Sequence, residues 1–508
     1  MGKKREERAK GHSPAVSGCN LDGSYTSPIQ SFQDISTETL KNTIFSSRYV
    51  QLLLSLTVIG LILRFFNLGY NSLWLDEAST LTFASMSLPG IWEATTGGEF
   101  NPPLFYWTEH IMLLFGNSEV ILRFVPALLG VLTIPLVYVI GKEFYDRNVG
   151  IIAAAAVTVS PFLIFYSQEA RAYTMMMFFV ALAMIFFLLA MKSDDLKHWG
   201  LFGVFSALAF WSHFYGFVLI ASLVLYALYV KAGKIQKDLR NLLPVAVAVG
   251  VFSLICLPLI IVTIQLYFIR TAGAPTYGIQ GFDLIIETFR QMSGFSDIAM
   301  VLMLALFIVG IVQAFMTDRD KGVFLVSLTV LTFAISIILS YRIPMQPRYL
   351  IFLTIIYFIA IAIAYKPVCS LLSNRGVIYG FMALLVLLSA PTLAGYYAGY
   401  SKEDWRGVST SLGEMTNEGD FVVVMPGYIL QPLNYYYSNT TDKTILFGLS
   451  TADELDALSI RNTQNATVWY VVTGDIMSAD PSGGAVGWLK EFTTPRMQSN
   501  NIVIFSSR

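Results

Sequence analysis

The chain has 508 residues, of which 55% are hydrophobic and 14% aromatic, whereas only 13% carry a charge. Its apolar stretches repeatedly reach the length that crosses a lipid bilayer, so the composition excludes an ordinary water-soluble enzyme and predicts a polytopic membrane protein. The net charge of -1 gives no indication of a nucleic-acid partner.

The first 47 residues are rich in Ser and Thr, and their basic cluster, GKKREERAK, is followed by no cleavage site of small residues. We therefore expect a disordered cytosolic tail, no removable signal peptide, and a first span that serves as its own anchor. Cys19 lies in this tail, whereas Cys256 and Cys369 lie in or beside hydrophobic runs. This placement predicts neither a disulfide nor a zinc framework.

Runs of about 17 or more apolar residues predict about eleven transmembrane helices. The expected spans are 49–67, 122–141, 149–166, 172–191, 198–212, 214–230, 242–268, 298–316, 322–340, 349–365 and 376–397. The stretch 104–116 is too short to span and contains Glu109 and His110, so it predicts an interfacial or re-entrant helix.

Charge places the loops on two sides of the membrane. With eleven spans, the basic segments all fall on one side: the tail, 142–147, 192–197, 231–240, 319–321 and 366–375. The other side has no lysine before Lys402, and its long first loop, 67–121, has six acidic residues and no Lys or Arg. Short cytoplasmic loops carry excess Lys and Arg, so we expect a cytoplasmic N-terminus and an extracytoplasmic C-terminal part, in the cell membrane.

The composition changes at Ser401. The runs DFVVVM, ATVWYVV and NIVIF resemble strands, and a helical pattern follows KEDWRGV, so 401–508 is expected to form a small soluble α/β domain. Glycosylation patterns at Asn439 and Asn465 fit an extracytoplasmic location. The predicted organisation is a tail (1–47), a transmembrane domain (48–400) with its first outer loop (67–121), and the α/β domain.

Polar groups that are costly in a membrane gather near the outer ends of the spans. They are Asp76 and Glu77 in LWLDEA, Glu169 and Arg171 in FYSQEARAY, His213 in WSHFYG, and Arg342, Arg348 and Tyr349 in YRIPMQPRYL. An ionised side chain in hydrocarbon costs about 2.5–3.5 kcal/mol, so such groups are normally paired, interfacial, or turned towards a polar cavity. Their convergence on one face is the main functional signal.

Each group also has a purely structural interpretation. The acidic pair could be a solvated helix start, Glu169 and Arg171 an ion pair at a helix end, and His213 a hydrogen-bonded core residue. The arginines could anchor helices at the interface, although lysine, which normally shares that task, is absent. In NPPLFYW, Pro102 and Pro103 fix backbone angles and restrict Asn101 to an extended conformation, which indicates a role in shaping the loop.

Together, the groups suit transfer of a sugar from a polyprenyl phosphate. A carboxylate can deprotonate an acceptor hydroxyl, typically worth about 10²–10⁴-fold, and arginine forks or a metal can stabilise the departing phosphate. The isoprenoid tail of such a donor would stay in the bilayer, which explains a catalyst within the membrane.

These motifs resemble the GT-C membrane glycosyltransferases of the protein O-mannosyltransferase-like superfamily, which includes the aminoarabinose transferases that act on lipid A. The resemblance runs from LWLDEA through NPPLFYW, SPFLIFYSQEARAYT and SHFYG to PRYLIFL, over most of 49–400, and KEDWRGV with GDFVVVMPGY resembles the outer domain of prokaryotic members. It implies a GT-C fold and transfer with inversion in one displacement, without a covalent nucleophile.

The resemblance also implies roles for single residues. Asp76 would be the catalytic base and Glu77 would support it or a divalent cation, while Glu169 and Arg171 would belong to the donor site. Arg348 would contact the phosphate. From the residues themselves, Arg342 and Tyr349 are further candidates for that contact, and His213 is a candidate to position the donor or bind metal. Many relatives have a charged residue or histidine where this chain has Asn101, so the resemblance does not decide whether a metal ion binds.

Two other functions remain. A transporter or flippase for a lipid-linked sugar would also use outer arginines, but it should show cavity charges reachable from both sides and repeats, which the sequence lacks. An oligosaccharyltransferase would share the fold, but the C-terminal domain lacks a WWDYG-type string. The sequence specifies neither the sugar, nor whether the acceptor is a glycan, lipid or protein, nor the oligomeric state.

Overall fold

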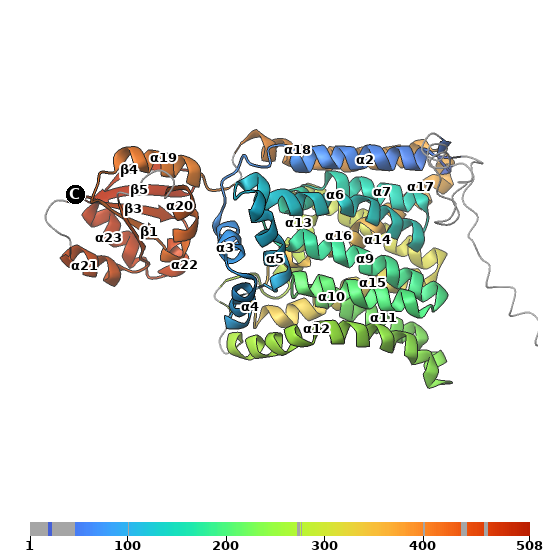
Figure 1. Ribbon diagram of the computed structural model, residues 1–508. Helices are drawn as coiled ribbons and strands as arrows, with labels where there is room; N and C mark the ends of the chain where they lie inside the picture. Colours follow the sequence, from blue (N-terminus) through green and yellow to red (C-terminus); the bar gives the residue numbers. More distant parts are fainter. Residues whose placement is uncertain are drawn as a thin grey trace, which may run out of the picture. The chain divides into compact units, whose positions relative to one another are not determined.

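The computed structural model describes residues 19–22, 46–99, 101–271, 275, 277–399, 402–437, 444–461 and 466–507. The chain forms two compact units, which are described separately (Figure 1). The helical unit comprises Met1–Phe66, Trp92–Phe105 and Phe124–Ala394. The sheet unit comprises Asn67–Ile91, Tyr106–Arg123 and Gly395–Arg508.

Within the described residues, nine helices are long and apolar enough to cross a membrane. They are α2 (Arg48–Phe65), α6 (Glu119–Phe144), α9 (Tyr173–Ser193), α11 (Gly216–Ile235), α12 (Leu243–Arg270), α14 (Asp297–Thr317), α15 (Arg319–Ser340), α16 (Leu353–Ile363) continued by α17 (Tyr365–Leu372), and α18 (Gly376–Ala398). A bent pair, α7 (Arg147–Val159) and α8 (Pro161–Ser167), makes ten if it forms one span.

The remaining predicted span corresponds to α10 (Leu196–Ser212), which has only 17 residues. At about 1.5 Å per residue it is about 26 Å long, slightly less than the hydrocarbon thickness. The stretch predicted to be too short to span forms α5 (Pro103–Met112) and the 3₁₀ turn η4 (Leu113–Phe115). The expected helical architecture is present, with nine or ten full-length spans among the described residues rather than eleven.

The break between α7 and α8 is stabilised by the end of α2. Pro161 has no backbone N–H, so the last carbonyl groups of α7 need other donors. Arg64 supplies them, donating to the carbonyl oxygens of Val157 at 2.8 Å and Thr158 at 3.2 Å. In return, the Gln168 amide donates to three carbonyl groups at the end of α2, at 2.8, 3.0 and 3.3 Å. The two helix ends thereby fix the start of the SQEARAY segment.

The centre of the helical unit is formed by α16 and α7, whose side chains are buried almost throughout. A helix that is apolar on all sides is suited to such a position. The helices α14 and α16 approach closely at Gly310, where a Cβ atom would lie 1.7 Å from the Ala360 carbonyl oxygen. By contrast, α2 and α18 expose large apolar side chains, such as Ile62 and Leu387, as expected for lipid-facing helices.

Several segments predicted to lie on one side of the membrane meet at one end of the helical unit. Lys192 Nζ lies 2.9 Å from Glu143 Oε2, and the Tyr145 hydroxyl lies 2.7 Å from Thr317 Oγ1. Lys321 Nζ lies 4.8 Å from the centre of the Tyr145 ring. These contacts join 142–147, 192–197 and 319–321, so the charge pattern predicted their common location.

The expectation that no disulfide forms was wrong. The structure pairs Cys19 with Cys369, with Cα atoms 6.4 Å apart, across 350 residues of sequence. Residues 19–22 are docked here, since Asn148 Nδ2 donates to the Cys19 carbonyl oxygen and Leu21 is buried. The sequence gives no local signal for a contact between such distant segments.

The sheet unit contains a five-stranded mixed sheet in the order β2-β1-β3-β5-β4. The strands are β1 (Phe421–Met425), β2 (Ile445–Gly448), β3 (Val468–Thr473), β4 (Thr493–Ser499) and β5 (Ile502–Ser507). β1 runs parallel to β2 and β3, whereas β5 runs antiparallel to β3 and β4. The three strand-like runs coincide with β1, β3 and β5, which confirms the α/β prediction; the patterns at Asn439 and Asn465 lie outside the described residues.

Helices cover both faces of this sheet (Figure 1). One face packs against α19 (Trp405–Met415) and α20 (Leu430–Tyr437). The other packs against α21 (Ala452–Arg461) and α23 (Gly484–Phe492). The helix α3 (Leu75–Ala84), which carries the acidic pair of the first loop, packs against α20.

Candidate active site

An arginine and aromatic cluster lies in the helical unit where several helices begin or end. Arg171 precedes α9, His213 ends α10, and Arg348 lies in the 3₁₀ turn η6 (Pro347–Leu350). The Cζ atoms of Arg171 and Arg348 each lie 5.9 Å from the centre of the Tyr173 ring. Arg348 is also 5.7 Å from the ring of Tyr349. The fold thus brings together arginines that are 177 positions apart in sequence.

Aromatic rings enclose this cluster. The rings of Tyr215 and Tyr349 stack at 4.9 Å with an interplanar angle of 14°, and His213 lies 5.5 Å from Tyr173 and 5.3 Å from Tyr349. The buried hydroxyl of Tyr215 has no hydrogen-bond partner in the described part of the chain. Since a buried hydroxyl normally has a partner, it is a candidate contact for a bound molecule.

His213 is neutral in this setting. Burial, together with the positive charges of Arg171 and Arg348, lowers the pKa of its imidazole from 6.5 to about 3. The cationic groups of the cluster are therefore the two guanidinium groups. Glu169, which is buried and lies two residues before Arg171, supplies a carboxylate. Guanidinium groups bind phosphate oxygens in bidentate fashion, so this arrangement can hold a phosphate group.

The acidic pair of the first loop lies in the sheet unit, and its two carboxylates differ in environment. Glu77 is fully buried. Its Oε1 accepts a hydrogen bond from Arg123 Nε at 2.7 Å, and its Oε2 accepts from Arg123 Nη2 at 2.8 Å and from Lys402 Nζ at 3.1 Å. Glu77 is thus a structural anchor whose oxygens are engaged by two cations.

Asp76 is only half-buried. Because successive residues of a helix project about 100° apart, its side chain leaves α3 in a different direction from that of Glu77. A carboxylate in the first turn of a helix is also stabilised by the helix dipole. Asp76 is therefore the more exposed member of the pair.

Residues of the C-terminal domain hold this part of the loop in place. Ser79 Oγ of α3 donates to Gln431 Oε1 of α20 at 2.6 Å. The Tyr436 hydroxyl donates to Glu119 Oε1 at 2.7 Å, and Arg406 forms an ion pair with the same carboxylate. The acidic loop and the C-terminal domain are one structural unit, so Asp76 depends on both for its position.

The remaining predicted site residues are Asn101, Pro102, Pro103 and Arg342. Asn101 Nδ2 donates to Glu99 Oε1 at 3.1 Å, Pro102 is buried, and Pro103 is the first residue of α5, a position that proline favours. Arg342 is exposed in the turn after α15, outside the aromatic cluster.

A metal site is not evident in the residues that the structure describes, among which no three His, Cys, Asp or Glu side chains form a suitable group. Of the candidates, Glu77 is already neutralised by Arg123 and Lys402, so a metal would have to displace a cation there. His213 and Glu169 belong to the helical unit, whereas Glu77 belongs to the sheet unit.

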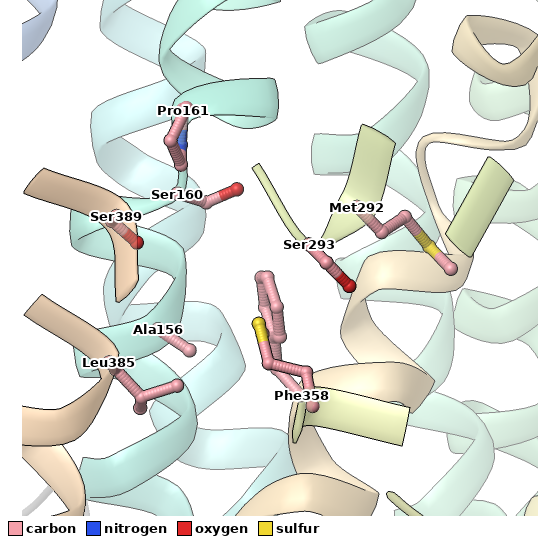
Figure 2. A pocket seen from close by; sticks show the side chains of 9 residues that line it. Ala156, Ser160, Pro161, Met292, Ser293, Phe358, Leu385 and Ser389 are labelled. Carbon is pink, nitrogen blue, oxygen red and sulfur yellow. The ribbon is translucent and has the colours of Figure 1, made fainter. Parts of the chain in front are cut away.

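A small cavity lies at the break between α7 and α8 (Figure 2). It is lined by Ala156, Ser160, Pro161, Met292, Ser293, Met303, Phe358, Leu385 and Ser389. None of the predicted site residues is among them, and the lining has no ionisable group. This cavity therefore offers no catalytic chemistry.

Residues that the sequence did not single out support each of these two groups of side chains. Arg123 and Lys402 hold Glu77, while Tyr173 and Tyr215 complete the arginine cluster. Lys402 was detectable in principle, as the first lysine on the predicted outer side. The tyrosines were not, because the chain has 26 of them.

Comparison with known proteins agrees with this description. Residues 101–262 match the family model of dolichyl-phosphate-mannose-protein mannosyltransferases. An uncharacterized protein of Aquifex aeolicus is 28% identical over 183 residues, which are 34% of this chain and 37% of that protein. The sequence similarity thus covers about a third of each chain.

Solved structures resemble almost the whole chain. ArnT from Cupriavidus metallidurans in the apo state has a TM-score of 0.58 at 15% identity, with 91% of this chain and 98% of ArnT covered. ArnT bound to undecaprenyl phosphate has a TM-score of 0.56 at 12% identity, covering 89% and 97%. The Archaeoglobus fulgidus oligosaccharyltransferase in complex with Zn and sulfate has a TM-score of 0.55 at 15% identity, covering 90% and 73%.

The chain is therefore an integral membrane protein with the GT-C fold, and the predicted resemblance is confirmed. The family match is confined to residues 101–262, and the structural likeness extends the GT-C fold over almost the whole chain.

Proposed function

We propose that the protein transfers a sugar from a polyprenyl-phosphate monosaccharide to a hydroxyl group of an extracytoplasmic acceptor. The observation that carries the proposal is the convergence of Arg171 and Arg348 on the Tyr173 ring, beside a histidine that stays neutral. Two guanidinium groups in a largely buried setting suit an anion, and the surrounding spans suit its isoprenoid tail. ArnT, a structure of similar fold, was solved with undecaprenyl phosphate.

Asp76 is the general base of this proposal. It would take the proton of the acceptor hydroxyl as the oxygen attacks the anomeric carbon and the lipid phosphate leaves. Glu77 is excluded from that role because Arg123 and Lys402 occupy its oxygens. A single displacement by the hydroxyl inverts the anomeric centre and needs no covalent nucleophile.

The remaining assignments follow from the same reaction. Arg171 and Arg348 bind the donor phosphate, Tyr349 packs against Arg348, and Glu169 and His213 orient the donor. The first loop and the C-terminal domain face the extracytoplasmic side of the cell membrane, and the N-terminus lies in the cytoplasm. A divalent metal is not required by these roles.

The test is a transfer assay in proteoliposomes with a panel of radiolabelled polyprenyl-phosphate sugars and candidate acceptors, with and without chelator. The proposal predicts that one donor is consumed, that labelled product forms, and that free polyprenyl phosphate accumulates. Labelled donor that crosses the bilayer unconsumed would instead indicate a flippase. Consumption of a diphosphate-linked oligosaccharide with transfer to an asparagine peptide would indicate an oligosaccharyltransferase.

A further inference from the structure

The parallel part of the sheet has a reversal in its connections. From β1 the chain passes through α20 to β2 on one side, and then through α21 to β3 on the other side of β1. In open α/β sheets, ligands bind beyond the carboxyl ends of the strands at this reversal point. Here that edge is formed by the residues that follow Met425 of β1 and Thr473 of β3.

Polar side chains gather at this edge. Glu403, just before α19, accepts hydrogen bonds from Trp405 Nε1 at 2.9 Å and from Asn501 Nδ2 at 3.5 Å. The Asn501 carbonyl oxygen accepts from Gly474 N, at the end of β3, at 3.2 Å. Burial raises the pKa of Glu403, and the charge of nearby Asp475 raises it further. The loops after β3 and before α19 therefore present two neighbouring carboxylates.

An aromatic side chain lies beside them. Tyr428 follows β1 and is 47% exposed. Asp475 follows β3, the neighbour of β1, with Met425 paired to Val472, so Tyr428 and Asp475 follow the carboxyl ends of adjacent strands. Burial raises the pKa of the Tyr428 hydroxyl, and the charges of Asp475 and Glu403 add to that effect. An exposed aromatic ring next to two carboxylates offers an apolar face and strong hydrogen-bond acceptors.

A buried hydroxyl independently marks the same edge. Thr473 is 2% exposed, and its Oγ1 has no hydrogen-bond partner within the described residues. Side chains alternate along a strand, so Thr473 lies on the same face as Trp469 and Val471, which pack with Trp405 of α19. The hydroxyl is therefore directed to the face where Glu403 leads into α19, and a bound polar molecule would satisfy it.

This edge is joined to the helix that carries Asp76. Lys402, next to Glu403, binds Glu77 at 3.1 Å, and Arg406 N donates to Ser72 Oγ at 3.1 Å. Lys402 and Arg406 are themselves paired with Glu77 and Glu119, so this edge of the sheet presents hydrogen-bond acceptors beside the apolar face of Tyr428. It suits a neutral molecule rich in hydroxyl groups.

We propose that this edge of the sheet binds a carbohydrate acceptor, with a sugar ring against Tyr428 and its hydroxyl groups donating to Glu403, Asp475 and Thr473. The proposal deepens the proposed glycosyl transfer, on which it rests, by naming the acceptor as a glycan. The C-terminal domain would then select the acceptor that Asp76 deprotonates.

The test measures binding of neutral oligosaccharides of mannose, glucose, galactose and N-acetylglucosamine to the full chain in nanodiscs, by saturation-transfer NMR and titration. At least one should bind, and Tyr428→Ala and Asp475→Asn should each weaken it by about 10-fold or more. The matched controls are Phe492→Ala and Glu491→Gln, because both residues are exposed, Phe492 to 49%, and directly precede β4 at the opposite edge. The controls should bind as wild type does.

Failure to bind any oligosaccharide, or equal binding by all variants, would overturn the proposal. Binding of unglycosylated peptides that Tyr428→Ala and Asp475→Asn abolish would also overturn it, in favour of a protein acceptor. These measurements need no donor, so they are independent of the transfer assay. If wild type bound glycan but consumed no polyprenyl-phosphate sugar, glycosyl transfer would fail while the binding site remained.

Discussion

Arg123 donates two parallel hydrogen bonds to Glu77, from Nε to Oε1 at 2.7 Å and from Nη2 to Oε2 at 2.8 Å. The same guanidinium donates to the backbone carbonyl groups of Leu68, Asn71 and Ser72, so it ties the first loop to the start of α6. The two adjacent acids therefore differ in their surroundings: Glu77 is fully buried and fixes the loop, whereas Asp76 is half-buried.

The first prediction concerns this ion pair. Glu77→Gln leaves the buried Arg123 and Lys402 without their carboxylate, and Arg123→Ala removes the bidentate partner of Glu77. Breaking a buried ion pair typically costs about 3–5 kcal/mol. We expect a clear decrease in the free energy of unfolding, measured by thermal or denaturant unfolding in micelles. Glu93→Gln, an exposed acid of the same loop, should leave stability unchanged. If Glu77→Gln unfolded like wild type but lost all transfer, Glu77 would have a chemical rather than structural role.

A second prediction separates donor binding from stability. Arg171→Gln and Arg348→Gln each remove a charged donor to phosphate, an interaction worth about 1.5–3 kcal/mol, so the KM for the polyprenyl-phosphate sugar should rise about 10- to 100-fold. Lysine at either position should restore only part of the affinity, since it lacks the planar fork. Arg375→Gln, exposed between α17 and α18, serves as the control.

The corresponding variant Arg342→Gln measures how much Arg342 contributes to donor affinity. Its exposure, outside the aromatic cluster, predicts a smaller rise in KM than that of Arg348→Gln. Unchanged KM in both Arg171→Gln and Arg348→Gln would contradict the phosphate assignment.

The third prediction is that His213 makes the stability of the fold depend on pH. The pKa of His213 is lowered from 6.5 to about 3, so below pH 6.5 the unfolded chain binds a proton that the folded chain does not. Stability should therefore fall as the pH decreases from 6.5 to about 3, by up to about 1.4 kcal/mol per pH unit. His213→Gln should reduce this slope, measured as the unfolding midpoint against pH. An unchanged slope would show that His213 is not buried in its neutral form.

The fourth prediction concerns Glu109, whose effect on the pH dependence of stability is opposite to that of His213. It is buried without a hydrogen-bond partner among the described residues, and burial raises the pKa of its carboxyl well above 4.5. The folded chain thus keeps a proton that the unfolded chain loses above pH 4.5, and this group makes the fold less stable as the pH rises. Glu109→Met, of similar size, should raise the unfolding midpoint at neutral pH and flatten its dependence on pH; a lower midpoint would contradict this.

Much of the architecture was predictable because it depends on local patterns. Apolar runs located the spans, alternating residues located β1, β3 and β5, and the excess of Lys and Arg grouped the loops that meet at one end. Two details were not predicted: the short length of α10 and the bend at Pro161. In both cases the apolar run was correctly predicted to be helical, but not the exact form of the helix.

The site was predictable only in part. Motifs indicated Asp76, Arg171 and Arg348, but they gave no information on which cation neutralises Glu77. Its partners, Arg123 and Lys402, are 46 and 325 residues away. Such pairings depend on the tertiary fold, as does the contact between Cys19 and Cys369.

The most direct measurement of the central claim is the rate of sugar transfer by Asp76→Asn in proteoliposomes at saturating donor and acceptor. Asparagine is close in size to aspartate and keeps the start of α3, so the variant should unfold like wild type and bind donor with unchanged affinity. The proposed function predicts a fall in kcat of about 10²-fold or more, the usual contribution of a general base. A folded Asp76→Asn variant that transfers sugar at the wild-type rate would contradict the assignment of Asp76 as the base.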